Sequence, residues 1–190
     1  MKSKTKIVNL IGGPGVGKST TAARVFSELK AKNVSCELVT ELAKDITWED
    51  TKKLLDNQIW LFSEQFRRQW RLLDKVDFVI TDSPLIMYIE YLERLQKKLP
   101  DTLKFSPMHF IMTKKFFQST FEEFWNLNFI IEREFDYIET GRNQTKEEAI
   151  ELDQAIIKRV KAGQGHFLTV PAKSDTPLHP ITKYILNVHI

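Results

Sequence analysis

The chain has 190 residues, of which 42% are hydrophobic and 28% charged, and it contains 13 Phe and 4 Trp. This length and composition predict one folded domain over residues 1–190, and they exclude a disordered chain or two full-sized domains. The formal net charge of +3 suits anionic ligands, but by itself it does not indicate a nucleic-acid-binding protein.

The single cysteine, Cys36, excludes an internal disulfide bond and a cysteine-based zinc site. No apolar run approaches the roughly 20 residues that a membrane-spanning helix needs. The first residues lead into a predicted strand rather than into the apolar segment of a signal peptide. We therefore expect a cytoplasmic protein with no membrane partner.

Strands and helices alternate along the chain, which predicts an α/β fold with helices on both faces of a parallel sheet. Hydrophobic periodicity and helix-capping signals predict the following elements in chain order. They are a strand at 6–11, a helix ending near Asn33, a strand at 34–40, a helix at 51–73, a buried strand at 78–80, a helix around 117–124, a strand at 129–131, a helix opened by the capping box Thr145-x-x-Glu148, a strand at 167–170 and a closing helix around 181–188.

The stretch 96–112 fits neither the helical nor the strand period, and it contains Pro100, Pro107 and several lysines. We expect an irregular excursion from the core there. Long loops of this kind are usually functional or mobile.

A glycine-rich motif, Gly12–Ser19, follows the first strand and matches G-x-x-x-x-G-K-[ST] in full. Its glycines let the backbone curl so that successive N–H groups point at a phosphate, and the next helix adds its positive N-terminus. Lys18 is predicted to reach the β- and γ-phosphates of ATP, and the Ser19 hydroxyl to bind Mg²⁺. The nucleotide-binding residues that the motif predicts are Gly13, Pro14, Gly15, Val16, Gly17, Lys18, Ser19 and Thr20.

Together with this motif, the Glu41 region, Thr81–Pro84 and Gly141–Gln144 resemble the P-loop kinases of the nucleoside and nucleotide kinase group. The most similar members are thymidylate-kinase-like, nicotinamide-riboside-kinase-like and small phage-type kinases. The resemblance covers most of the chain, and it implies a P-loop NTPase three-layer sandwich that uses ATP and Mg²⁺. If a phage encodes the chain, the expected location is the host cytoplasm.

Asp82 comes directly after the buried strand, at the sheet edge where ligands of parallel sheets gather. A carboxylate there can bind Mg²⁺ or orient an attacking oxygen, although Asp82 could also only cap the next helix. Glu41 ends the second strand. By resemblance to deoxynucleoside kinases it is the candidate general base that accepts the proton of a substrate hydroxyl, and the alternative is a solvated glutamate at a helix start.

The resemblance places a mobile lid at about 133–145, with Arg133 and Arg142 closing over the transferring phosphoryl group. The planar, permanently charged guanidinium suits that role. Surface ion pairs with nearby glutamates are the alternative reading of both arginines.

A glutamine line, Gln58, Gln65 and Gln69, runs along the predicted helix at 51–73. Because an amide both donates and accepts hydrogen bonds, it can read the edge of a base. In the family resemblance a Phe-x-x-Gln segment contacts the acceptor base, and it maps onto Phe62 and Gln65. The alternative is that these residues are core aromatics and surface amides.

The leading interpretation is a kinase that transfers the γ-phosphoryl group of ATP to a nucleoside, nucleotide or related acceptor. Lys18, Mg²⁺ and the lid arginines would stabilise developing charge. A second interpretation makes the acceptor a 5-hydroxymethylpyrimidine base in phage DNA, with the basic stretch 97–115 as the groove. A third is a P-loop ATPase or nucleotide-binding switch. Both a monomer and a homodimer remain open.

Overall fold

The computed structural model describes residues 3–138, 140, 144–162 and 166–189. Its strands are β1 (Lys6–Ile11), β2 (Cys36–Val39), β3 (Phe78–Thr81), β4 (Trp125–Glu132) and β5 (Phe167–Pro171). Its α-helices are α1 (Lys18–Ala31), α2 (Leu42–Trp48), α3 (Gln58–Trp70), α4 (Met87–Lys98), α5 (Pro107–Glu122), α6 (Lys146–Ala162) and α7 (Pro180–His189), and two 3₁₀ helices are η1 (Lys52–Asp56) and η2 (Asp101–Leu103).

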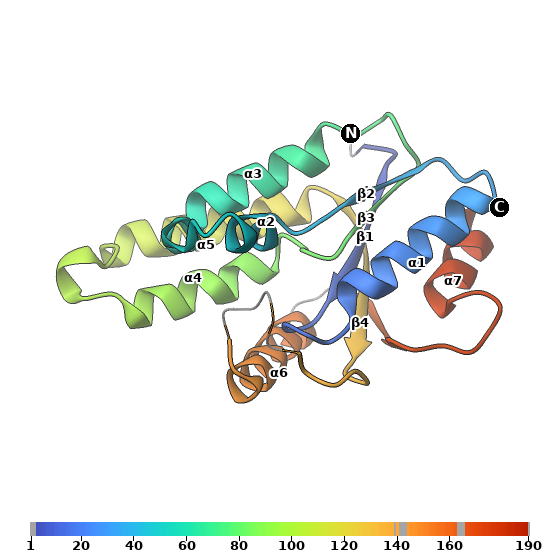
Figure 1. Cartoon of the computed structure of the whole chain (residues 1–190). Helices are drawn as coiled ribbons and strands as arrows, with labels where there is room; N and C mark the ends of the chain where they lie inside the picture. Colours follow the sequence, from blue (N-terminus) through green and yellow to red (C-terminus); the bar gives the residue numbers. More distant parts are fainter. Residues whose placement is uncertain (1–2, 139, 141–143, 163–165, 190) are drawn as a thin grey trace.

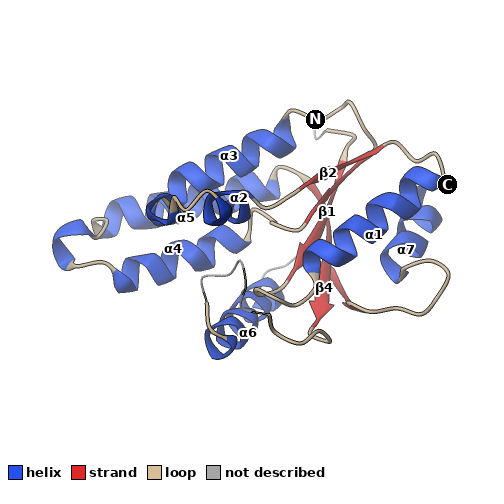
Figure 2. Cartoon of the chain, in the orientation of Figure 1, coloured by secondary structure: helices blue, strands red, loops and turns tan. Residues whose placement is uncertain are grey.

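The five strands form one parallel sheet in the order β2-β3-β1-β4-β5. Helices α1 and α7 cover one face, and the helices from α2 to α6 lie on the other side (Figures 1 and 2). In β1, Ile7 and Ile11 pack on the α2–α6 side, while Val8 and Leu10 pack on the α1–α7 side. The predicted three-layer α/β fold is therefore confirmed.

The short apolar run that begins at Phe78 is a central strand, as the sequence predicts. All four residues of β3 are buried, and the strand lies between β2 and β1. A strand covered on both faces needs apolar residues at every position, so it shows no alternation. In the described part of the chain, no helix is both long and apolar enough to span a membrane.

The single helix predicted at 51–73 is divided in the structure. The 3₁₀ helix η1 ends at Asp56, and α3 starts afresh after Asn57, whose side-chain oxygen accepts a hydrogen bond from the Trp60 N–H at 3.1 Å. An asparagine in this position satisfies one of the free N–H groups of the first turn and so starts a new helix. A further helix, α2, precedes η1 and was not predicted.

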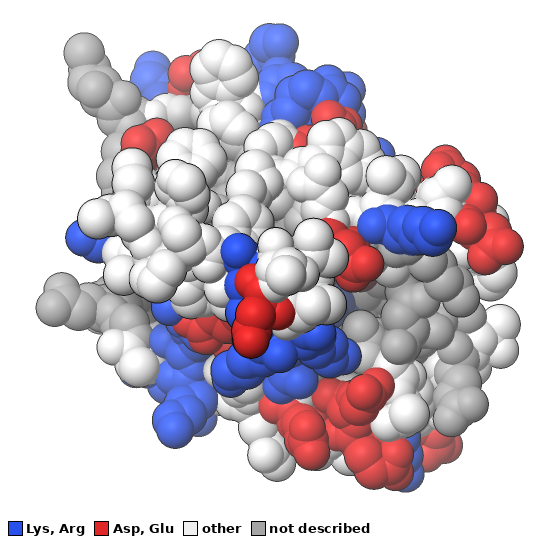
Figure 3. All heavy atoms as spheres, turned by 90° about the vertical axis from the view of Figure 1, so that its left-hand side faces the viewer, with Lys and Arg blue, Asp and Glu red and all other residues white. Residues whose placement is uncertain are grey.

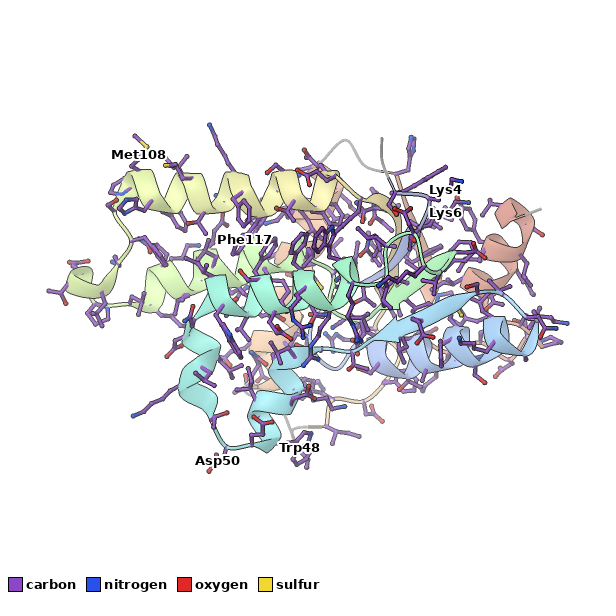
Figure 4. The ribbon with its side chains drawn as sticks, turned by 90° about the horizontal axis from the view of Figure 1, so that it is seen from above. Lys4, Lys6, Trp48, Asp50, Met108 and Phe117 are labelled. Carbon is purple, nitrogen blue, oxygen red and sulfur yellow. The ribbon has the colours of Figure 1, made fainter. Side chains whose placement is uncertain are left out.

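The irregular excursion predicted at 96–112 is helical over most of its length. Helices α4 and α5 form a hairpin that projects from the sheet, with η2 near its tip (Figure 1). Ser106 accepts a hydrogen bond from the His109 N–H at 3.3 Å, and Pro107 fits the first turn of α5. The prolines thus mark helix boundaries. The buried Phe117 points from α5 toward α3, whereas Met108 points away from the hairpin (Figure 4).

Candidate active site

The glycine motif forms the turn between β1 and α1, at the carboxyl end of a central strand. Gly15 and Gly17 have φ values of +73° and +105°, which lie in the left-handed region that favours glycine. A Cβ atom on Gly17 would also lie 2.6 Å from the ring of Phe135. The loop therefore takes a curved path that these glycines permit, and it ends at the N-terminus of α1, a ready site for an anion.

Lys18 is the first residue of α1 and is buried against the loop that precedes it. Its Nζ donates hydrogen bonds to Gly12 O at 2.8 Å and Gly13 O at 2.9 Å. Burial lowers the pKa of this ammonium group, and the carboxylates of Glu41, Asp82 and Asp153 oppose that effect by raising it. A lysine held at this point can approach phosphate groups placed over the loop.

Ser19 and Asp82 meet in the same site because β3 lies next to β1 in the sheet. The Ser19 hydroxyl donates to Asp82 Oδ2 at 2.6 Å, and Asp82 is 3% exposed. The second carboxylate oxygen, Oδ1, is buried and has no hydrogen-bond partner among the described residues.

This pair fits the needs of Mg²⁺, which usually binds through one or two protein oxygens together with water and substrate phosphates. A larger cage is absent from the described ranges, where no three His, Cys, Asp or Glu side chains are grouped to hold a metal. Ser19 and Asp82 are therefore the residues that could hold the ion.

Glu41 follows β2, starts α2 and lines the same cleft as Lys18. Burial raises the pKa of its carboxyl group, and the nearby Lys18 opposes this by lowering it. The backbone on both sides of Glu41 is held by Gln65, whose amide donates to Thr40 O at 3.3 Å and accepts from the Leu42 N–H at 3.4 Å. Sequence reasoning missed this support for Glu41.

The predicted Phe-x-x-Gln contact to an acceptor base is wrong for this chain. Phe62 and Gln65 are both 0% exposed. The Phe62 ring stacks on Phe117 with 3.8 Å between ring centroids, and both ends of the Gln65 amide bind backbone. Of the predicted glutamine line, Gln69 is also buried, and only Gln58 lines the cleft.

A cleft of about 630 Å³ runs from the loop past Glu41 to the side chains of α2, α3 and α4. Its far end, which we call the acceptor end, is lined by Lys44, Trp48, Gln58, Tyr88, Tyr91, Arg94 and Lys98. Burial raises the pKa of the hydroxyl groups of Tyr88 and Tyr91, so both stay protonated and can donate hydrogen bonds. Aromatic rings, an amide and cations suit a flat, polar and anionic ligand.

Arg133 follows β4 and lies against the loop. Its Nε is 3.3 Å from Asp153 Oδ2, and its Nη2 donates to Pro14 O at 3.0 Å. Asp153, on α6, also accepts the Gly13 N–H at 2.7 Å. Sequence reasoning missed Asp153 because it is 140 residues from Gly13 in the loop. The signal that could have found it is a carboxylate among the inward-facing residues of α6.

Arg142 lies outside the described residues, so its role stays a prediction, as does a lid at about 133–145.

The family model described as an AAA domain matches residues 7–176 of the chain. None of the curated proteins compared with the sequence matches it. Two solved structures of the NadR protein, in complex with NR and with NAD and AMP-PNP, match with TM-scores of 0.67 and 0.60 and identities of 18% and 16%. The matches cover 97% of this chain but 51% and 49% of the NadR chains, so the sequence spans about half of their length.

Two kinases match over nearly their whole length. Deoxyadenosine kinase from M. mycoides, with bound dATP, has a TM-score of 0.53 and 16% identity, over 100% of this chain and 99% of that one. Thymidylate kinase from Candida albicans has a TM-score of 0.50 and 12% identity, over 99% and 92%. At these identities the likenesses show the fold, and they confirm that the chain has the P-loop fold of nucleoside and nucleotide kinases.

Proposed function

We propose that this chain, which belongs to the AAA domain family, is a kinase that transfers the γ-phosphoryl group of ATP to a nucleoside, nucleotide or related acceptor. One observation carries the proposal: a single cleft holds Lys18 and Ser19 of the loop, the carboxylate of Glu41 and an acceptor end beyond it. A simple ATPase or nucleotide-binding switch needs only the phosphate-binding residues of the loop, Lys18 and Ser19. A kinase needs room for two substrates in line.

ATP is the proposed donor, and Mg²⁺ its proposed counterion. The curved loop, the buried Lys18 and the Ser19–Asp82 pair support this choice, as does the AMP-PNP bound to NadR. When bound, Mg²⁺ neutralises charge on the phosphate oxygens. Lys18 would stabilise the negative charge that develops as the bond from the γ-phosphorus to the bridging oxygen breaks and ADP leaves.

The proton of a hydroxyl acceptor is assigned to Glu41. As the acceptor oxygen bonds to the γ-phosphorus, the Glu41 carboxylate accepts the proton that this oxygen loses. Gln65 holds the backbone around Glu41 and thereby limits where the carboxylate can lie. We also retain Arg142 as the lid arginine that closes over the transferring phosphoryl group.

A modified base in DNA is the second candidate acceptor. The cations Lys44, Arg94 and Lys98 at the acceptor end favour it, since they could contact backbone phosphates. However, Lys114 pairs with Glu93, and acidic side chains lie beside basic ones on the face toward the hairpin tip (Figure 3). A continuous basic groove is a poor description of this face, so a small acceptor ranks first.

The test is transfer of γ-labelled phosphate from ATP to four sets of acceptors: nucleosides, nucleoside monophosphates, DNA with 5-hydroxymethylpyrimidines, and water alone. The proposal expects label on one small-acceptor set in the wild type and none with Lys18→Ala. Label on DNA alone would support the second candidate. Release of free phosphate at the same rate with and without every acceptor would overturn the kinase proposal in favour of an ATPase.

A further inference from the structure

Two side chains from outside the glycine motif bind its backbone directly. Asp153 on α6 accepts the Gly13 N–H at 2.7 Å, and Arg133 after β4 donates to the Pro14 carbonyl at 3.0 Å. The two side chains also bind each other, with 3.3 Å between Arg133 Nε and Asp153 Oδ2. Asp153 is 8% exposed, so its carboxylate is held in a largely dry setting. A buried carboxylate of this kind is stable only with such partners.

These two contacts fix the orientation of two peptide groups. In a trans peptide the C=O and the following N–H point in opposite directions. Because the Gly13 N–H points to Asp153, the Gly12 carbonyl points the other way, where it accepts the Lys18 Nζ at 2.8 Å. Because the Pro14 carbonyl points to Arg133, the N–H of Gly15 is directed away from that arginine. The two contacts thus orient the Gly12 carbonyl, which accepts a hydrogen bond from Lys18, and the Gly15 N–H.

Helix α6 packs directly against the same part of the loop. A Cβ atom on Gly13 would lie 2.8 Å from Ala149 O and 2.9 Å from Asp153 Cβ, so only glycine lets the loop approach the helix this closely. Further along α6, Arg159 binds Glu90 at 3.2 Å and also Glu93, both on α4. The helix that carries Asp153 is therefore supported from a second side, and it can hold the carboxylate at a fixed position.

We propose that Asp153 and Arg133 form a clamp that sets the shape of the phosphate-binding loop, with Asp153 as a positioning residue for the bound nucleotide. The proposal rests on the proposed function, since it concerns the donor half of the same site. It gives Arg133 a role in the ground-state complex. That role differs from the lid role expected from the sequence, in which Arg133 would act on the transferring phosphoryl group.

The clamp is tested with Asp153→Ala, Asp153→Asn, Arg133→Ala and the Asp153→Ala/Arg133→Ala double variant. Glu151→Ala is the matched control, because it removes an exposed carboxylate from the same helix. Calorimetry measures the Kd for MgATP without any acceptor. Turnover is measured with the acceptor that the phosphate-transfer assay identifies. Thermal unfolding checks that each variant is folded. Asp153→Asn keeps an oxygen that can accept the Gly13 N–H but loses the charge that pairs with Arg133.

We expect Asp153→Ala and Arg133→Ala each to weaken MgATP binding by about tenfold or more, as for a lost hydrogen bond to a charged group. The Kd of the double variant for MgATP should not exceed that of the single variant with the larger Kd, because both changes release the same loop. Asp153→Asn should fall between wild type and Asp153→Ala, and Glu151→Ala should match wild type. If Asp153→Ala does not fold, Asp153→Asn and Arg133→Ala still carry the comparison.

Three outcomes would overturn the clamp. The lid role predicts that Arg133→Ala leaves the Kd unchanged and lowers turnover about 10³-fold or more, additively with Asp153→Ala. A purely structural contact predicts lower melting temperatures with unchanged Kd and turnover. If the wild type does not bind MgATP, both the clamp proposal and the kinase proposal fail. If the wild type binds MgATP but phosphorylates no acceptor, the kinase proposal fails, while the Kd series still decides the clamp.

Discussion

At the residue scale, the cleft brings together ionisable groups that burial disfavours in their charged forms. Burial lowers the pKa of Lys18 and raises that of Glu41, and each group partly offsets the effect on the other. Such an arrangement costs stability compared with solvated side chains, so it is typical of sites selected for chemistry. The side chains concerned can therefore be tested one by one.

Lys18→Ala should abolish transfer while the protein stays folded. The ammonium group is bonded to two loop carbonyls rather than packed as part of an apolar core, and losing one preorganised charge costs about 10²- to 10³-fold in rate. Turnover and thermal unfolding are measured side by side, with the exposed Lys32→Ala at the other end of α1 as control. Near-normal turnover of Lys18→Ala would refute the assignment of the phosphate site.

Glu41→Gln should lower kcat/KM with a hydroxyl acceptor by about 10²-fold or more, with little change in ATP affinity. Because burial raises the pKa of Glu41, its carboxyl group becomes protonated and inactive at a pH above the ordinary glutamate value. Wild-type kcat/KM should therefore fall as the pH drops through this raised pKa. The Gln variant should lack that acid limb, and a pH–rate profile of both proteins measures it. If the Gln variant keeps the same fall in kcat/KM at low pH, Glu41 is not the general base. If Glu41→Gln lowers kcat/KM only mildly, the acceptor is a phosphate, which needs no base.

Arg142→Ala should lower turnover by roughly 10³- to 10⁵-fold and change ATP affinity only a few-fold, if Arg142 acts on the transferring group. Arg142→Lys keeps the charge but loses the two-pronged guanidinium, so it should recover only a small part of the rate. Steady-state kinetics and calorimetry on both variants measure these effects. Full recovery by lysine would instead indicate an ordinary surface ion pair.

At the scale of elements, local capping residues mark where α3, α5 and α6 begin. The predicted capping box is confirmed at α6, where Glu148 N–H donates to the Thr145 hydroxyl at 3.2 Å and Thr145 N–H donates to Glu148 Oε2 at 3.1 Å. Asn57 and Ser106 start α3 and α5 by the same chemistry. The start of α6 is of functional interest, since this helix carries Asp153 to the loop.

Thr145→Ala should destabilise the protein by about 1 kcal/mol, the usual cost of losing an N-terminal cap. Urea unfolding measures the change in the free energy of unfolding. The control is Ser63→Ala, which removes a hydroxyl from an exposed position inside α3 and should stay within about 0.5 kcal/mol of wild type. Equal stability of the two variants would mean that the cap contributes nothing measurable.

At the scale of the whole molecule, the sheet order places the site. Strands β1 and β3 are neighbours, and β2 lies beside β3, so the residues after all three meet at one edge. Ligands of open parallel sheets gather at the carboxyl ends of the strands. The motif, Glu41 and Asp82 follow these strands, and the buried residues on both faces hold the strands in register.

If the proposed site is right, MgATP should raise the melting temperature of the wild type, because a ligand that binds only the folded chain stabilises it. At a concentration one hundred times the Kd, one bound ligand stabilises a protein by about 2.7 kcal/mol. For a chain of this size that corresponds to a shift of several degrees. Thermal unfolding with and without MgATP measures the shift, and Lys18→Ala should show much less of it. Identical shifts in both proteins would place the nucleotide elsewhere.

The sequence alone predicted the features that depend on neighbouring residues. These are the strand–loop–helix context of the glycine motif, the apolar run of β3, the capping box of α6 and the α/β class. Each follows from short-range periodicity or from hydrogen bonds between residues close in sequence. The break at Asn57 and the start of α5 after Ser106 depend on an asparagine cap and on a proline in the first helical turn, which the hydrophobic period does not show. Helix α2 also escaped prediction, because it is only seven residues long and has no side-chain cap.

Only the tertiary structure decided what the glutamines and acids of the middle and late chain do. Gln65 was expected to read a base, but it is fully buried and binds the backbone around Glu41. Asp153 is not among the site residues that the sequence predicts, yet its carboxylate accepts the Gly13 N–H of the loop. The reason is physical: an amide or carboxylate has the same hydrogen-bonding capacity everywhere, and its role is set by the partner that folding brings within about 3 Å. For Asp153 that partner lies 140 residues away.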